Sequence, residues 1–138
     1  MNSSSKPTDE RATPQELFDA LAKEHGPFDM DVCATRANAK CSAFYSMEAD
    51  GLKWPWLGTI WCNPPYSRGN TVKWIKKAIE ERKAGRAKKV VMLLPAATSN
   101  AWWHDYIPYC ASFKFIRGRV KFGGAKTGAK FASVGVVL

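Results

Sequence analysis

The chain has 138 residues, 46% of them hydrophobic, which is enough for one domain with a real core and too short for several domains. Its formal net charge is +9. No apolar run approaches the 18 residues of a membrane span, and the four cysteines form no Cys-x-x-Cys pair. We therefore expect a soluble, cytoplasmic protein with free thiols, no metal and no membrane contact.

The first predicted helix follows a polar segment. Residues 1–11 are rich in serines and charges, so we expect a disordered N-terminal tail. Thr13 is predicted to cap the helix, with Pro14 in its first turn and Glu16 completing a capping box. Gly26-Pro27 is expected to end the helix.

The rest of the chain alternates strands and helices. Apolar runs at 58–62 and 89–95 predict strands, the second of them central in a parallel sheet. Residues 71–85 have helical spacing, with Lys77 among the residues expected to face solvent. Further predicted elements are a strand over 28–34, a loop or short helix over 35–45, a loop over 46–55, a short helix capped by Thr98 or Ser99 and reaching Tyr106, and strands over 112–116 and 131–138. This order predicts an α/β fold with a single, mainly parallel sheet flanked by helices over residues 12–138.

One four-residue motif, Asn63-Pro64-Pro65-Tyr66, follows the predicted strand 58–62 directly. The Asn63 carboxamide oxygen and the Pro64 carbonyl can each accept one N–H of an exocyclic amine, and two prolines stiffen the loop. Tyr66 can stack on a base. The motif should lie at the carboxyl end of its strand, where open α/β sheets bind ligands. The pattern favours methylation of an amine on a planar carbon; the alternative is a rigid turn with Tyr66 in the core.

The positive charge is confined to the second half of the chain. Residues 1–81 contain 10 Lys/Arg and 11 Asp/Glu, or −1, whereas residues 82–138 contain 11 Lys/Arg and only Asp105, or +10. A one-sided basic surface favours a polyanionic partner, most simply nucleic acid. A basic protein without such a partner is the alternative.

Several sequence blocks stand in a fixed order over roughly residues 12–138. They are Thr13-Pro14, 28–34, 49–52, 61–67, 94–96, 102–104 and 118–122. Together they resemble the small phage-encoded DNA N6-adenine methyltransferases of the phage Dam type. The resemblance implies a Rossmann-like fold, S-adenosylmethionine as cofactor, DNA as partner, and adenine N6 as the acceptor in a flipped-out base. It also implies the cytoplasm of a bacterial host as the location.

The same resemblance implies roles for individual residues. The catalytic residues would be Asn63, Pro64, Pro65 and Tyr66. Residues near the cofactor would be Thr13, Pro14, Asp31, Cys33, Ala34 and Asp50. Arg119 and Lys121 could grip DNA phosphates, and Phe122 could stack on the flipped base; a strand end with solvated charges is the alternative. We expect Asp31 and Asp50 to approach a common cavity that also borders Asn63.

Alternatives remain open at several of these positions. Asp31 could be a structural acid bonded to backbone amides, and Asp50 a plain Asp-Gly turn residue. The segment 34–38 lacks the glycine that methyltransferases usually carry after their first strand, which leaves room for an inactive DNA-binding relative. A methyltransferase acting on an RNA base or on a protein glutamine is the other alternative.

Overall fold

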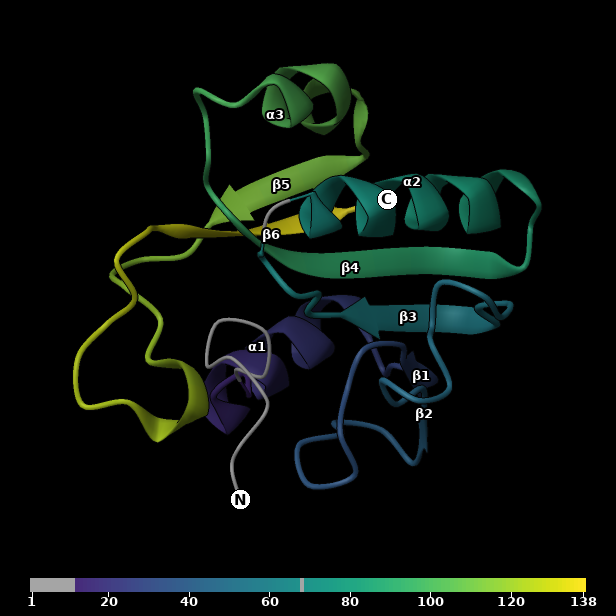
Figure 1. The fold of residues 1–138 in the computed structure, drawn as a ribbon, viewed down its shortest axis with the longest axis horizontal. Helices are drawn as coiled ribbons and strands as arrows, with labels where there is room; N and C mark the ends of the chain where they lie inside the picture. Colours follow the sequence, from purple (N-terminus) through teal and green to yellow (C-terminus); the bar gives the residue numbers. More distant parts are fainter. Residues whose placement is uncertain (1–11, 68) are drawn as a thin grey trace.

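Helices and strands alternate along the part of the chain that the computed structural model describes, residues 12–67 and 69–138 (Figure 1). The tail predicted over residues 1–11 lies outside the described residues. The elements are α1 (Gln15–His25), β1 (Met30–Asp31), β2 (Ala43–Phe44), β3 (Gly58–Cys62), α2 (Asn70–Lys83), β4 (Ala87–Pro95), α3 (Ala101–Tyr106), the 3₁₀ turn η1 (Ile107–Tyr109), β5 (Ser112–Phe115), the 3₁₀ turn η2 (Phe122–Gly124) and β6 (Ser133–Val137).

The strands form one six-stranded sheet in the order β2-β1-β3-β4-β6-β5. Strands β2, β1, β3 and β4 pair in parallel. Strand β6 runs antiparallel to both of its neighbours, β4 and β5, so it is inserted between two strands that share one direction. The prediction of a single, mainly parallel sheet flanked by helices is confirmed.

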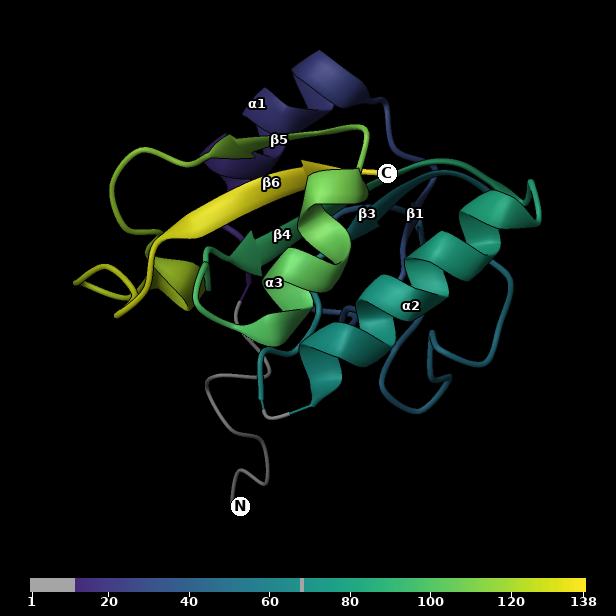
Figure 2. The ribbon, with the colours of Figure 1, turned by 90° about the horizontal axis from the view of Figure 1, so that it is seen from above.

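Both faces of the sheet are covered, and β4 shows how. Val90, Met92 and Leu94 point into an apolar cluster with residues of α2 and α3. Val91 and Leu93, which alternate with them, point into a second cluster with residues of α1. Figure 2 shows α1 on one side of the sheet and α2 and α3 on the other. A central strand buried on both faces explains the near-continuous apolar run seen in the sequence.

The strand predicted over 28–34 is reduced to the two residues of β1. Its pairing with β3 continues only to Val32, whose N–H donates to the carbonyl of Trp61 (3.2 Å). The next amide, that of Cys33, donates to the carboxylate of Asp31 (3.3 Å) and not to β3, while the amide of Ala34 donates to the carbonyl of Tyr45 on the β2 side (3.1 Å). Residues 35–45, predicted as a loop or short helix, contribute the short strand β2.

Three predictions of local contacts are wrong. Thr13 does not cap α1, because the helix begins at Gln15 and its N-cap position is Pro14; the Thr13 hydroxyl accepts from Asn63. Lys77 does not face solvent; its side chain is 10% exposed and forms an ion pair with the buried Glu81 (3.2 Å). Neither Thr98 nor Ser99 caps α3, which starts after Asn100 without a side-chain cap.

Candidate active site

The Asn63–Tyr66 loop begins immediately after β3, at the carboxyl end of that strand as predicted. The Asn63 side-chain nitrogen Nδ2 donates to the Thr13 hydroxyl (2.9 Å). The Tyr66 hydroxyl lies 2.6 Å from the carbonyl oxygen of Leu93 in β4 and 3.0 Å from Oδ1 of Asn63. These contacts tie the loop to two neighbouring parts of the fold, so the carboxamide is held in one place.

The ring of Tyr66 joins this loop to the segment before β6. It makes edge contacts with Phe122 (ring centroids 6.0 Å apart) and Phe131 (5.5 Å). Phe122 lies in η2 and is 6% exposed, while Arg119 and Lys121 beside it are exposed. The structure thus brings the predicted nucleic-acid-binding residues to the motif. Stacking of Phe122 on a base would require this buried ring to become accessible, and stays a prediction.

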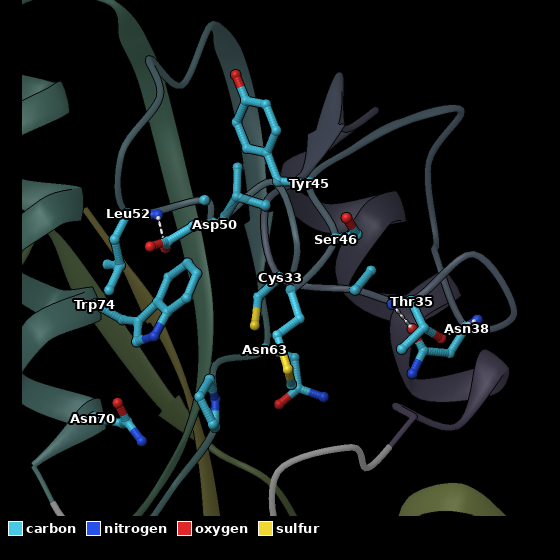
Figure 3. Close-up of a pocket in the computed structure, with 15 residues that line it drawn as sticks. Cys33, Thr35, Asn38, Tyr45, Ser46, Asp50, Leu52, Asn63, Asn70 and Trp74 are labelled. Atoms are coloured by element: carbon cyan, nitrogen blue, oxygen red, sulfur yellow. Dashed lines mark hydrogen bonds between the residues drawn. The ribbon is translucent and has the colours of Figure 1, made fainter. Parts of the chain in front are cut away.

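A cavity of about 320 Å³ lies in front of the loop (Figure 3). Asn63 and Asn70 lie at its lower end in the view, and Trp74 and Cys33 face one another across it. Five of the predicted residues line it together: Cys33, Ala34, Asp50, Asn63 and Pro65. Pro64, Tyr66, Thr13, Pro14 and Asp31 are not part of its wall.

Asp50 reaches the cavity from a sharply turned loop between β2 and β3. Its φ of 59° is left-handed, and its Oδ1 accepts from the amide of Leu52 (3.1 Å). A Cβ on Gly51 would collide with the carbonyl oxygen of Val32, so the next position needs glycine. The indole of Trp56 donates to the Gly51 carbonyl (2.8 Å) and fixes the turn. Asp50 is therefore both a turn residue and a cavity residue.

The turn after β1 is built without glycine. The amide of Thr35 donates to Oδ1 of Asn38 (2.7 Å), and the amide of Asn38 donates back to the Thr35 hydroxyl (3.2 Å). This reciprocal pairing closes the turn with ordinary backbone angles, and both residues line the cavity. The absence of glycine, noted in the sequence, therefore does not prevent a tight turn here.

Asp31 does not share the main cavity with Asp50, so the predicted convergence of both acids is wrong. Its buried carboxylate accepts from the amides of Lys40 (2.9 Å) and Cys33 (3.3 Å). Burial raises the pKa of this carboxyl to about 6, although those hydrogen bonds act in the opposite direction. It borders a small recess, of about 10 Å³, that Thr13 and Asn63 also border. This geometry is that of the structural acid considered as the alternative.

Sequence reasoning missed Asn70 and Trp74, which project into the cavity from α2 (Figure 3). A usable signal was present, because a helix that starts a few residues after Tyr66 must begin at the same edge of the sheet. Side chains in the first turns of this helix then point toward the same cavity as the motif. The buried residues of α2 are Thr71, Trp74, Ile75, Ala78 and Glu81.

The segment 116–132, between β5 and β6, carries the strongest local charge near the motif. It contains Arg117, Arg119, Lys121, Lys126 and Lys130 and no acidic residue. All five cations are exposed. Within residues 12–67 and 69–138, no group of three His, Cys, Asp or Glu side chains could hold a metal ion. No helix in the same ranges is long and apolar enough to cross a membrane.

Sequence comparison relates the chain to proteins named as methyltransferases. The chain is 39% identical over 97 residues to the DNA N-6-adenine-methyltransferase of Escherichia phage T1, which covers 68% of this chain and 39% of the phage protein. It is 34% identical over 65 residues to a protein of Escherichia coli (strain K12) named "Putative methyltransferase YfdM", covering 42% of this chain and 71% of that protein. The family model for DNA N-6-adenine-methyltransferase (Dam) matches residues 2–135, and the chain therefore belongs to this family.

Proposed function

We propose that this protein transfers a methyl group from S-adenosylmethionine to the exocyclic N6 of adenine in DNA, with the target base flipped into the Asn63–Tyr66 pocket. The observation that carries the proposal is the position of Asn63. Its carboxamide stands at the carboxyl end of a sheet strand, on the wall of a cavity that could hold a small molecule. Membership of the DNA N-6-adenine-methyltransferase family supports the acceptor.

The amine must be activated, because its lone pair is delocalised into the base. Oδ1 of Asn63 and the carbonyl oxygen of Pro64 would each accept one N–H and hold the nitrogen so that its lone pair leaves conjugation. The hydrogen bonds from the amine to both acceptors would strengthen as positive charge develops on the nitrogen. They would therefore stabilise mainly the transition state. Tyr66 and the stiff Pro64-Pro65 pair would hold the base in place.

The cavity suits the proposed cofactor in size and lining. Its volume of about 320 Å³ falls in the range of small-molecule sites, roughly 300–1,000 Å³. Asp50 offers a carboxylate for a hydroxyl or an ammonium group, and Trp74 offers an aromatic wall. Cys33 and Ala34 would line the same site. When bound, the cofactor would supply a methyl group carried on a positively charged sulfur.

The acceptor is proposed to be DNA held by the basic segment 116–132. Arg119 and Lys121 are exposed next to η2, which packs through Phe122 on Tyr66, so phosphate contacts would form beside the proposed base pocket. Similarity to a protein of Escherichia phage T1 supports the cytoplasm of a bacterial host as the proposed working compartment. Residues 12–138 would act as one methyltransferase domain.

Labelled S-adenosylmethionine, incubated with the protein and with DNA, RNA or protein substrates in parallel, tests the proposal directly. We expect label in DNA and its recovery as N6-methyladenine after nucleoside analysis. Label in RNA or in protein glutamine would show that DNA is not the methyl acceptor. No transfer to any substrate would favour a DNA-binding relative without methyltransferase activity.

The variant Asn63→Ala tests the proposed role of the Asn63 carboxamide. We expect a loss of roughly 10²–10³ in methylation rate, by analogy with the removal of one oxyanion-hole donor, with binding of cofactor and DNA nearly unchanged. Asn100→Ala is the control, because Asn100 is exposed and makes no side-chain cap to α3. Wild-type rates for Asn63→Ala would show that the motif is only a rigid turn.

A further inference from the structure

The hydrogen bond between Thr13 and Asn63 joins residues 50 positions apart in the sequence. Thr13 is 4% exposed and stands just before α1. The N-cap position of α1 is Pro14, which has no side-chain acceptor, and the Thr13 hydroxyl, one residue before it, accepts from Nδ2 of Asn63 (2.9 Å). The hydroxyl is therefore used at the candidate active site rather than at the helix.

A carboxamide has two chemically opposite ends of similar shape, and its hydrogen-bond partners decide which end points where. At Asn63 the nitrogen end faces Thr13, and the oxygen end lies 3.0 Å from the Tyr66 hydroxyl. A reversed carboxamide would present N–H groups where the proposed chemistry needs an acceptor. The orientation of this one amide therefore decides whether an amine could be held.

We propose that Thr13 is a positioning residue: its hydroxyl and that of Tyr66 bind the two ends of the Asn63 carboxamide, and the contact with Thr13 holds the group in place with Oδ1 available to the amine. The inference rests on the proposed function and replaces the cofactor-binding role that the family resemblance implied for Thr13. Thr13 is not part of the wall of the main cavity; it borders the small recess with Asp31, Cys33 and Asn63.

The support behind Thr13 is rigid enough for this role. The amide of Phe18 donates to the carbonyl of Pro14 (3.1 Å), which fixes the first turn of α1 next to Thr13. Phe18 packs edge-on against Trp61 of β3, with ring centroids 5.2 Å apart. Trp61 precedes Asn63 by two residues, so Thr13 and Asn63 are carried by elements that pack directly on each other.

Three proteins test the role: wild type, Thr13→Val and Thr13→Ser. Valine keeps the shape of threonine without the hydroxyl, and serine keeps the hydroxyl without the methyl. We expect Thr13→Val to lower kcat by about 10- to 100-fold, as misplacement of a reacting group does, with KM for DNA and cofactor unchanged. Thr13→Ser should restore most of kcat. A raised cofactor KM with unchanged kcat would instead indicate cofactor binding and overturn the proposal.

A second measurement does not depend on activity. The side-chain amide of Asn63 gives a pair of ¹H–¹⁵N resonances that can be assigned by their disappearance in Asn63→Asp. We expect Thr13→Val to shift these resonances and to speed their exchange with water, and Thr13→Ser to leave them close to wild type. Unchanged resonances in Thr13→Val would overturn the proposal. If wild type methylates nothing, the proposed function fails while this measurement still decides the role of Thr13.

Discussion

Asp31 and Glu81 are both buried carboxylic acids, but their surroundings move their pKa values in opposite directions. Burial dominates at Asp31, which has two backbone amides as partners, and its pKa rises to about 6. At Glu81 the hydrogen bonds with Arg86 dominate over burial, and its pKa falls to about 2. The difference follows from the partners: a guanidinium neutralises the buried charge, whereas amide dipoles only reduce its cost.

The raised pKa of Asp31 predicts a pH dependence of stability. Between its ordinary value of 3.8 and about 6, the folded state binds a proton that the unfolded state has lost. The free energy of unfolding should therefore fall as pH rises through this window, by about 3 kcal/mol from this group, and level off above it.

Urea denaturation of wild type and Asp31→Asn at several pH values measures this slope. We expect the difference in unfolding free energy between the two proteins to change across the window from pH 3.8 to about 6 and to be constant above it. Glu81 acts at lower pH, because its stabilising charge is lost only as pH falls from 4.5 towards about 2. Parallel curves for the two proteins would contradict the raised pKa.

The sequence predicts the positions of some functional residues but not their hydrogen-bond partners. The position of Asn63 could be predicted, because the apolar run before it and the prolines after it are local signals. The partner of Asn63 could not be predicted, since Thr13 lies 50 residues away and had a plausible local use as a helix cap. The roles of Cys33 and Asp50 on the cavity wall were accessible only through the family resemblance.

At the scale of elements, α2 is tied to the loops that precede β3 and β4 by a charge cluster around the buried Glu81. Glu81 is 1% exposed and accepts from the amide of Trp56 (2.8 Å), from Lys77 (3.2 Å) and from Nε and Nη2 of Arg86 (2.8 and 2.7 Å). Trp56 in turn stacks on Trp74, with ring centroids 6.0 Å apart. The cluster thus connects α2 to the loop that presents Asp50.

Glu81→Ala should destabilise the protein by about 3–5 kcal/mol, because it leaves the nearly buried Lys77 without its main partner. The control is Glu80→Ala on the same helix. Its side chain is 69% exposed and 3.9 Å from Lys77, so its removal should cost less than about 0.5 kcal/mol. Thermal or urea unfolding of both variants makes the comparison, and equal losses would show that the cluster adds nothing.

Elements differ in how well local sequence predicts them. The long strand β4 and the helices α1 and α2 follow from apolar spacing and from their glycine and proline boundaries. Strands β1 and β2 have two residues each, and their pairing depends on partners such as Ile60 that lie far along the chain. No local pattern specifies such short strands, so only their neighbourhood was predicted.

For the whole molecule, the charge asymmetry between the two halves is the dominant electrostatic property. The half from residue 82 onward carries +10, and five of its cations lie in the segment 116–132. Because Phe122 packs on Tyr66, this segment is anchored to the proposed catalytic loop. Affinity for DNA should therefore come mostly from phosphate contacts made beside the loop.

Replacing Lys126 and Lys130 by Gln should weaken DNA binding and reduce its salt dependence. The slope of log K against log[salt] should become shallower by about 0.9 for each DNA phosphate that the variant no longer neutralises. Lys73 and Lys76, exposed on α2, provide a control pair with the same change in net charge. Fluorescence anisotropy with a DNA duplex at several salt concentrations gives both slopes; equal effects of the two pairs would refute a localised interface.

The insertion of β6 between β4 and β5 also sets the order in which the molecule can assemble on the ribosome. Strand β5 leaves the exit tunnel before residues 133–137, so it has no neighbour with which to pair in this sheet. Until β6 arrives, one edge of β4 and both edges of β5 are open. Nascent chains held at this stage are the ones that most need a chaperone.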